Sequence, residues 1–369
     1  MTRHKHSAPA RPLGRLERWP GLIEHYRRFL PVDERTPVVT LNEGNTPLID
    51  SPEIASRLGP DVKCYLKFEG ANPTGSFKDR GMTVAMSKAR GESARIAICA
   101  STGNTAASAA AYAGRAGMRA FVLIPKGAVA LGKLSQSVMH GAGVIEIIGN
   151  FDICLKVVRD VAESDPVSIR LVNSVNPDRI AGQKTAAFEI CDQLGDAPTH
   201  QFLPVGNAGN ITAYWAGYKE YKAEGLVSRL PKMMGYQAEG AAPIVLGHAI
   251  DDPHTVATAI KIGNPASWKG AEAARDESGG VIDMVSDAEI LAAYRLIASL
   301  GIFAEPASAA SVAGALKYAS SRGLPPGSVV VCTLTGHGLK DPDTALKNLS
   351  NTIVVEPDVN KVLKILQRG

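Results

Sequence analysis

Strand-like and helix-like patterns alternate along most of this 369-residue chain. Short apolar or alternating runs are typical of strands, and the amphipathic or alanine-rich runs between them are typical of helices. The expected strands are 62–69, 95–100, 118–125, 144–148, 168–172, 201–205 and 328–334, and the expected helices are 81–90, 105–116, 133–140, 152–163, 179–194 and 211–223. This alternation predicts an α/β fold of parallel sheets covered by helices on both faces. Ligands of such folds bind beyond the carboxyl ends of the strands, so we expect the chemistry in the turns that follow them.

The segment after the first of these strands places a lysine on a tight turn of small residues, just before a helix: Asn72-Pro73-Thr74-Gly75-Ser76-Phe77-Lys78-Asp79-Arg80-Gly81. A lysine fixed there is suited to covalent catalysis, because its amine forms Schiff bases with carbonyl groups. The alternative is a helix capping box made by Ser76 and Asp79, with Lys78 and Arg80 solvated in the first turn. The segment alone leaves both interpretations open.

Other turns combine small residues with hydroxyl and amide groups. Ser101-Thr102-Gly103-Asn104-Thr105 opens a helix, where it is either an anion site or an ordinary N-cap. Arg179, with Asn173 and Ser174 before it, is either an oxyanion clamp or a solvated helix start. The glycines of 206–210 let the backbone approach a phosphate. Thr335 ends the last strand, where its hydroxyl could meet a ring nitrogen, and nearby His337 is interpreted as structural.

Composition and motifs exclude several classes of function. A formal net charge of +4 is too small to indicate nucleic-acid binding. Gly127-x-x-x-x-Gly132-Lys133 resembles a P-loop, but Leu134 stands where a Ser or Thr would bind magnesium. No metal-ligand spacing is found, so we expect no metal site. Five scattered cysteines favour a reducing cytoplasm, and no apolar run is long enough to span a membrane.

Taken together, these loops resemble those of the fold-type II enzymes that depend on pyridoxal 5′-phosphate (PLP), and most closely those of the threonine synthase family. The resemblance runs from about Trp19 to about Lys347. It is carried, in family order, by Glu43-Gly44-Asn45-Thr46-Pro47-Leu48, the lysine turn, Ser101-Thr102-Gly103-Asn104-Thr105, Gly206-Asn207-Ala208-Gly209-Asn210, Glu305-Pro306-Ala307-Ser308-Ala309-Ala310 and Thr335-Gly336-His337-Gly338.

The resemblance implies a tryptophan synthase beta-like architecture, in which two three-layer α/β domains hold the cofactor in the cleft between them. We expect the small domain at residues 72–165 and the large domain at residues 1–71 and 166–369, with residues 1–18 as a flexible tail. The resemblance also implies a cytoplasmic homodimer that acts on a small molecule, with no nucleic-acid or membrane partner.

Site residues follow from the same resemblance. Lys78 is the catalytic lysine that carries PLP as a Schiff base. The other cofactor-binding residues are Asn104 at the 3′-oxygen, Thr335 at the pyridine nitrogen, and Gly206, Asn207, Ala208, Gly209 and Asn210 at the phosphate. The substrate-binding residues are Ser101, Thr102 and Thr105 for a carboxylate or phosphate, and Asn173, Ser174 and Arg179 for the substrate phosphate.

The implied enzyme is a carbon–oxygen lyase acting on phosphates. It converts O-phospho-L-homoserine and water to L-threonine and phosphate by γ-elimination and β-addition, the last step of threonine biosynthesis. The main alternative is a threonine or serine dehydratase, a PLP-dependent ammonia-lyase whose substrate has no phosphate. Two features favour the synthase: the loop 206–210 has fewer glycines than is usual in dehydratases, and Thr335 stands where they usually have Ser or Cys. A non-catalytic binding protein on this fold is a third possibility, against which the intact Lys78 argues.

Overall fold

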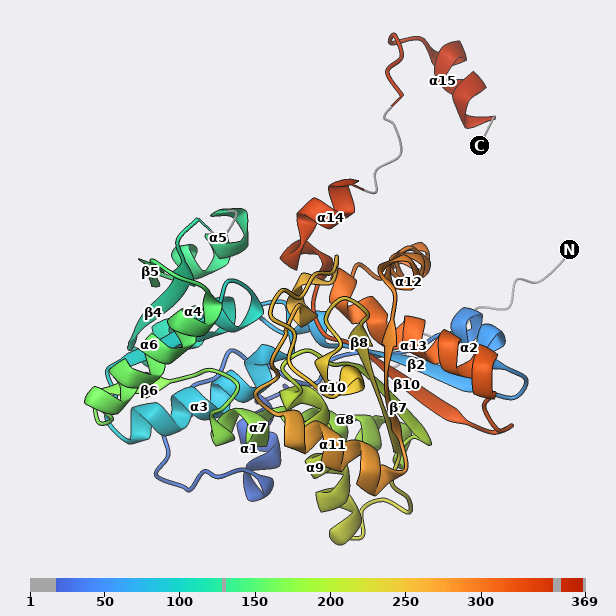
Figure 1. The fold of residues 1–369 in the computed structure, drawn as a ribbon. Helices are drawn as coiled ribbons and strands as arrows, with labels where there is room; N and C mark the ends of the chain where they lie inside the picture. The colour runs from blue at the N-terminus through green and yellow to red at the C-terminus, as the bar shows by residue number, and fades with distance from the viewer. Residues whose placement is uncertain (1–17, 128–130, 348–352, 368–369) are drawn as a thin grey trace, which may run out of the picture.

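Two separate sheets organise the protein (Figure 1). The structure is a computed structural model that describes residues 18–127, 131–347 and 353–367. The tail expected at residues 1–18, apart from Arg18, lies outside the described residues, and so do residues 128–130 of the P-loop-like stretch.

The larger sheet has six strands in the order β1-β2-β10-β7-β8-β9. Their bounds are β1 (Leu48–Asp50), β2 (Lys63–Phe68), β7 (His200–Pro204), β8 (Lys232–Ala238), β9 (Val281–Val285) and β10 (Val329–Leu334). All neighbours are parallel except β1, which pairs antiparallel with β2 at the sheet edge. The expected strands at 62–69, 201–205 and 328–334 are confirmed as β2, β7 and β10, and the other three were not predicted.

Helices cover both faces of this sheet, because each helix turns an apolar face toward it. The core on one face includes residues of α2 (Pro52–Leu58), α12 (Asp287–Ser299) and α13 (Pro306–Arg322). The core on the other face includes residues of α1 (Leu22–Tyr26), α8 (Thr185–Leu194), α9 (Gly209–Ala223) and α11 (Trp268–Ser278). The larger unit is therefore a three-layer α/β structure.

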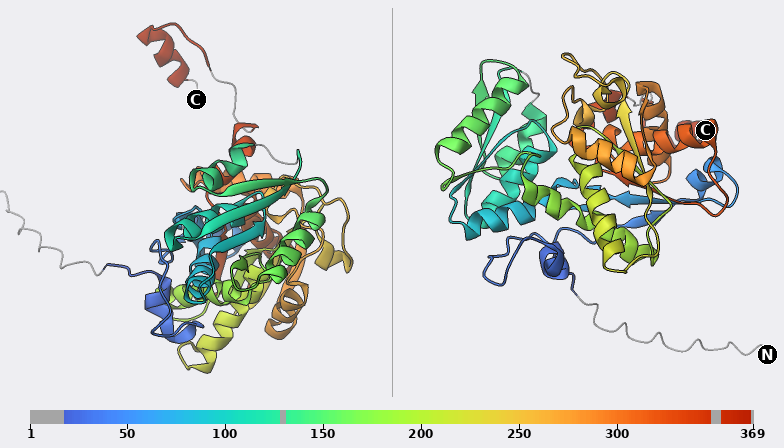
Figure 2. Two further views of the ribbon diagram at one scale, coloured as in Figure 1. Left: turned by 90° about the vertical axis from the view of Figure 1, so that its left-hand side faces the viewer. Right: turned by 60° about the horizontal axis from the view of Figure 1, so that its bottom comes forward.

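The smaller sheet has four parallel strands in the order β5-β4-β3-β6, built from β3 (Ile96–Ala100), β4 (Arg119–Pro125), β5 (Gly143–Ile147) and β6 (Ile169–Leu171). Its cores contain residues of α3 (Lys78–Gly91), α4 (Asn104–Ala116) and α5 (Leu131–Met139) on one side and of α6 (Phe151–Ser164) on the other. Figure 2 shows the two units side by side, with α1 beneath their junction. The expected domain boundaries stay a prediction, and β6 of the smaller sheet lies beyond residue 165.

The remaining elements connect or extend the two units. The helix expected at 179–194 is divided at Lys184 into α7 (Pro177–Gln183) and α8. Further short helices are α10 (Pro243–Leu246), α14 (Pro342–Lys347), α15 (Val359–Leu366), η1 (Arg27–Phe29), η2 (Glu69–Ala71), η3 (Thr258–Ile260) and η4 (Gly338–Lys340). Figure 1 shows α15 standing away from the body.

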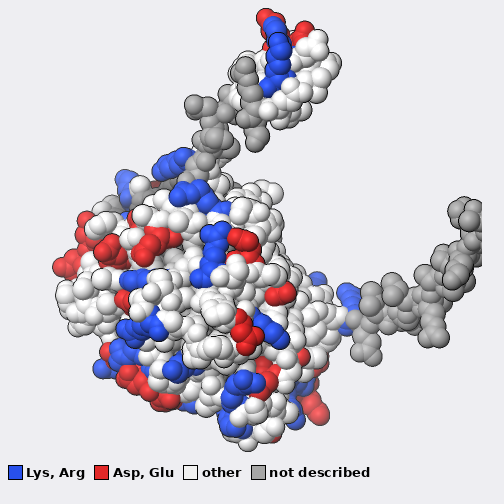
Figure 3. Space-filling view, turned by 90° about the vertical axis from the view of Figure 1, so that its right-hand side faces the viewer, with Lys and Arg blue, Asp and Glu red and all other residues white. Residues whose placement is uncertain are grey.

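Two surface properties bear on the expected partners. Within the described ranges, no helix has the length and hydropathy needed to cross a membrane. Figure 3 shows Lys and Arg side chains interspersed with Asp and Glu over one face of the molecule. Such a mixed face does not present the continuous basic patch that nucleic-acid binding uses.

A fully buried ionic network ties the start of α3 to the larger unit. Arg80 donates to Glu69 (Nε to Oε2, 2.7 Å) and to Glu189 (Nη1 to Oε1, 2.7 Å). Lys67 donates to the other oxygen of Glu189 at 2.9 Å and to the Thr46 carbonyl at 2.8 Å. The two cations offset the two carboxylates, so the desolvation of each charge is compensated within the network.

We predict that Arg80→Ala destabilises the protein by about 3–5 kcal/mol, because it leaves two buried carboxylates without their main partner. The matched control is Arg57→Ala, which removes an exposed pair with Glu53 and should cost less than about 1 kcal/mol. Guanidinium unfolding of the cofactor-free variants measures both changes. Equal losses in the two variants would contradict the central role of Arg80.

Candidate active site

The lysine turn is held against the turn that follows β10. The Phe77 N–H donates to the Thr335 carbonyl at 3.0 Å, and the His337 N–H donates to the Gly75 carbonyl at 2.8 Å. Lys78 is the first residue of α3, so this pairing fixes the point from which its side chain departs. The structure thus brings Lys78 and Thr335, which the sequence separates by more than 250 residues, into adjoining turns.

The capping-box alternative for this turn is wrong. The side chain of Asp79 turns back to accept from the Thr74 N–H (2.7 Å) and hydroxyl (2.5 Å), and also from Ser108 Oγ at 2.6 Å. Arg80 is fully buried rather than solvated. Asp79 and Arg80, the two residues that follow Lys78, therefore make their contacts inside the protein. The hydrogen bond between Asp79 and Ser108 fixes the turn to α4.

Two glycines let α3 and α7 pack with their backbones in contact. A Cβ atom at Gly81 would lie 2.6 Å from the Arg179 carbonyl oxygen, and one at Gly182 would lie 2.0 Å from the Arg80 carbonyl oxygen. Any larger residue at either position would push the helices apart. This close approach brings Arg179 near Lys78, whose pKa responds to its charge.

Arg179 is a buried cation with unused hydrogen-bond donors. Its side chain is fully buried, and Nη1 donates to the Val172 carbonyl at 2.9 Å. Neither Nε nor Nη2 has a partner among the described residues. Burial lowers the pKa of Arg179 to about 10, which leaves it charged at neutral pH. A buried guanidinium with unused donors is costly unless an anion completes it, so these donors form a candidate anion site.

Lys78 is a candidate general base. Burial, assisted by the positive charge of Arg179, lowers the pKa of its amine to about 7. The nitrogen lies 4.2 Å from the centroid of the Phe77 ring. At neutral pH a substantial fraction of this amine is unprotonated, which both Schiff-base formation and proton abstraction require.

Asn104 and Thr335 meet at a carboxylate that the sequence analysis assigned no role. Asn104 Nδ2 lies 3.0 Å and 3.2 Å from the two carboxylate oxygens of Glu305, and Thr335 Oγ1 donates to Glu305 at 3.1 Å. Burial raises the pKa of Glu305, while hydrogen bonds from the same two residues oppose the shift. Apart from its place in the family motif, no local pattern marks Glu305, because its partner Asn104 is 201 residues away.

The loop at residues 206–210 presents a row of backbone donors. No described residue accepts a hydrogen bond from the backbone N–H groups of these five residues. The loop leads into the 15-residue α9, whose dipole adds partial positive charge. Ala208 has a left-handed backbone (φ 65°), which turns the loop toward the helix. Asn207 Nδ2 donates to Ser174 Oγ at 2.9 Å and so joins this loop to the segment before Arg179.

The remaining predicted residues divide into two groups. Thr102 and Thr105 are partly exposed, and the described chain gives their hydroxyls no partner. Ser101 and Asn173 are used locally: Ser101 Oγ accepts from the Gly103 and Ala106 N–H groups, and Asn173 pairs through its amide with the Ala100 backbone at 2.9 Å and 3.0 Å. Their contacts fix the shape of the turn after β3.

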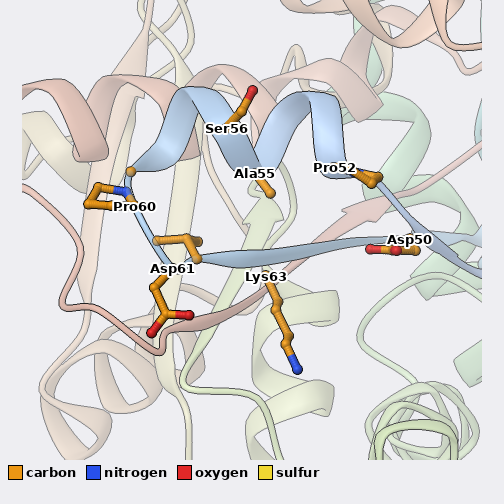
Figure 4. A pocket seen from close by; sticks show the side chains of 9 residues that line it. Asp50, Pro52, Ala55, Ser56, Pro60, Asp61 and Lys63 are labelled. Carbon is orange, nitrogen blue, oxygen red and sulfur yellow. The ribbon is translucent and has the colours of Figure 1, made fainter.

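Two surface cavities lie elsewhere. One of about 680 Å³ opens beside α2, lined by Asp50, Pro52, Ala55, Ser56, Gly59, Pro60, Asp61, Val62 and Lys63. Figure 4 shows the side chains of Ser56 and Lys63 pointing away from each other. No cluster of three or more potential metal ligands is found in the described part of the chain. The polar groups that gather around Lys78 therefore form the candidate active site.

Comparison with known proteins identifies the family of the chain. Residues 39–336 match the family of pyridoxal-phosphate dependent enzymes. The chain is 58% identical over 363 residues to threonine synthase of Synechocystis sp., covering 98% of this chain and 94% of the relative. It is 59% identical over 356 residues to threonine synthase of Halalkalibacterium halodurans, covering 96% and 99%. The chain belongs to the threonine synthase family.

The predicted architecture is also confirmed. The threonine synthase fold described above matches the solved structure of threonine deaminase isoform 2 from Solanum lycopersicum with a TM-score of 0.69, over 94% of this chain and 89% of that one. The identity is 22%, so this likeness concerns the fold alone. The fold is that of the fold-type II PLP enzymes, and PLP is the cofactor of the family.

The depressed pKa of Lys78 gives a prediction for stability. Between pH 7 and about 10.5 the unfolded chain binds a proton at Lys78 that the folded chain does not, so this group makes stability rise with pH. We expect Lys78→Met to stabilise the cofactor-free protein at pH 6.5, with a gain that shrinks by pH 9.5. Guanidinium midpoints of both proteins at the two pH values measure this, and a gain that does not change with pH would contradict the assignment.

Proposed function

We propose that this threonine synthase family member converts O-phospho-L-homoserine and water to L-threonine and phosphate at the site around Lys78. The observation that carries the proposal is Arg179, a fully buried guanidinium whose Nε and Nη2 lack partners in the described chain. A substrate phosphate would supply both with acceptors in one bidentate contact. A dehydratase substrate, which has no phosphate, would leave this buried charge uncompensated.

The residues present fit PLP. Unpartnered backbone donors of residues 206–210 at the start of α9 suit its phosphate. Lys78, Asn104 and Thr335 lie around one small buried region, in keeping with their proposed contacts to the aldehyde carbon, the 3′-oxygen and the ring nitrogen. When bound, PLP joins an amine through a Schiff base and withdraws electrons from the adjacent carbon.

Lys78 would carry the proton transfers of the reaction. Its amine, with a pKa of about 7, can accept a proton from a substrate carbon and return it without a large free-energy cost in either direction. The positive charge of Arg179 contributes to this pKa, so the group that binds the substrate phosphate also keeps the base unprotonated. A bound phosphate dianion would in turn weaken that effect and raise the pKa of Lys78.

The substrate would be oriented by two anion sites. Arg179, with Ser174 nearby, would hold the phosphate until it leaves, and Asn173 would contribute by fixing their segment to β3. The substrate carboxylate would lie at the start of α4, where the hydroxyls of Thr102 and Thr105 are available and Ser101 shapes the turn. Two fixed anions would align the carbon chain between them with Lys78.

The assembly and location of the protein are inferred from the same family. We infer a cytoplasmic homodimer. All five cysteines are buried and free, which is compatible with a reducing compartment. Light scattering of the purified protein would measure the mass in solution, and a monomer at working concentrations would contradict the homodimer.

The activity itself is tested by incubating the PLP-loaded protein with O-phospho-L-homoserine. We expect L-threonine and inorganic phosphate to be released in equal amounts, because each turnover removes one phosphate and adds one water. Ammonia release from L-threonine or L-serine, with no phosphate release from phosphohomoserine, would instead identify a dehydratase.

Arg179→Ala should lower kcat/KM for O-phospho-L-homoserine by about 100-fold or more, as expected when one partner of a buried charged contact is removed. The affinity for PLP should stay close to that of the unmodified protein. The control is Arg170→Ala, which removes an arginine that pairs with Glu92 at the surface. Steady-state kinetics and PLP titration check this, and an equal loss of substrate use and PLP affinity would move Arg179 out of the substrate site.

A further inference from the structure

Glu305 is the N-cap residue of α13, but its side chain does not cap the helix. The carboxylate is instead 3% exposed and turned toward Asn104 of the smaller unit and Thr335 at the end of β10. Its backbone is fixed as well, because the Glu305 N–H donates to the Gly336 carbonyl at 2.9 Å. The carboxylate thus links the two units at the candidate site.

The neighbouring chain leaves room for this carboxylate. A Cβ atom at Gly336 would lie 2.6 Å from the Glu305 carboxyl carbon and 2.6 Å from Oε1. Real Cβ atoms do not approach this closely, so a larger residue at position 336 would displace the Glu305 carboxylate from this place. Ser308 Oγ accepts from the Gly336 N–H at 3.1 Å and lies 3.1 Å from Thr335 Oγ1. These two contacts hold residues 335 and 336 in place beside Glu305.

Fold stability does not explain a carboxylate at this point. A buried acid held by two neutral side chains recovers little of its desolvation, and a neutral residue of similar size would cost less. The charges of Lys78 and Lys340 offset the burial of Glu305 only in part, since its pKa stays raised. Buried residues that cost stability, as this carboxylate does, are concentrated at functional sites.

We propose that Glu305 is a positioning residue for the cofactor ring, acting through Asn104 and Thr335. This inference rests on the proposed function, in which those two side chains face the ring. The carboxylate takes one amide proton from Asn104 and the hydroxyl proton from Thr335. The second N–H of Asn104 is then free for the 3′-oxygen, and the lone pairs of Thr335 Oγ1 accept from the ring nitrogen in its protonated form.

The Glu305→Gln substitution removes this arrangement with almost no change of shape. Glutamine offers one acceptor oxygen, while its NH₂ group can only donate. If its oxygen takes the place of Oε1, it can still accept from Thr335. Its NH₂ group then stands at the place of Oε2, which lies 3.0 Å from Asn104 Nδ2, so two donors face each other and Asn104 has to turn away. Glu305→Asp keeps both oxygens and the charge, and its shorter side chain should restore part of the effect.

The test is a PLP titration of the cofactor-free full-length variants, followed by the absorption band of the Schiff base at Lys78 across pH. For Glu305→Gln we expect a Kd for PLP raised about tenfold or more, the loss typical of one hydrogen bond to a charged group, together with a shifted band or band midpoint. Its stability without cofactor should equal or exceed that of the unmodified protein, and Glu305→Asp should lie between the two in affinity and band position.

The matched control is Glu43→Gln, the same change at another fully buried carboxylate, which accepts from the Tyr112 hydroxyl at 2.8 Å. It should lower the stability of the cofactor-free protein and leave the band unmoved. A Glu305→Gln protein with unchanged PLP affinity and an unchanged band would overturn the proposal. Failure of the proposed function would be distinct, because the unmodified protein would then form no band or release no threonine.

Discussion

The candidate active site depends on one buried ionic network centred on Arg80. This guanidinium lies two residues after Lys78 and uses three nitrogens to bind Glu69 and Glu189, at distances of 2.7–2.8 Å. Glu69 follows β2, Glu189 lies on α8, and α3 begins at Lys78, so one cation connects three elements. Removing such a group strands charges in a low-dielectric interior, so the start of α3 has little freedom to shift. The position of Lys78 follows from that restraint.

Polar groups in the interior fall into two kinds. Those of the Arg80 network are fully paired, and they support the fold. Nε and Nη2 of Arg179 and the backbone N–H groups of residues 206–210 lack partners in the described chain. Open donors of this kind are preorganised for a ligand, because their desolvation cost is met before binding. The same distinction separates Glu305 from a purely structural acid, since its two partners are themselves proposed to face the cofactor.

The sequence predicted the alternating elements well, because buried parallel strands and amphipathic helices leave clear periodic signals. It missed the antiparallel β1, since that pairing depends on where the edge of the sheet lies. It ran α7 and α8 together, because Lys184, the N-cap of α8, makes no side-chain cap hydrogen bond and is not a typical capping residue. Lys78 and Arg179 were singled out as candidates from their turns, and the structure places them near each other. Glu305 and the burial of Arg80 depend on partners far along the chain, which no local pattern reveals.

The central claim is that the fold presents Lys78, and no other lysine, to the cofactor. The most direct test is to load the protein with PLP, reduce it with borohydride and locate the phosphopyridoxyl group by peptide mass spectrometry. The account predicts one modified residue per chain, Lys78. Modification at the buried Lys67 or Lys340, or a label spread over surface lysines, would contradict it.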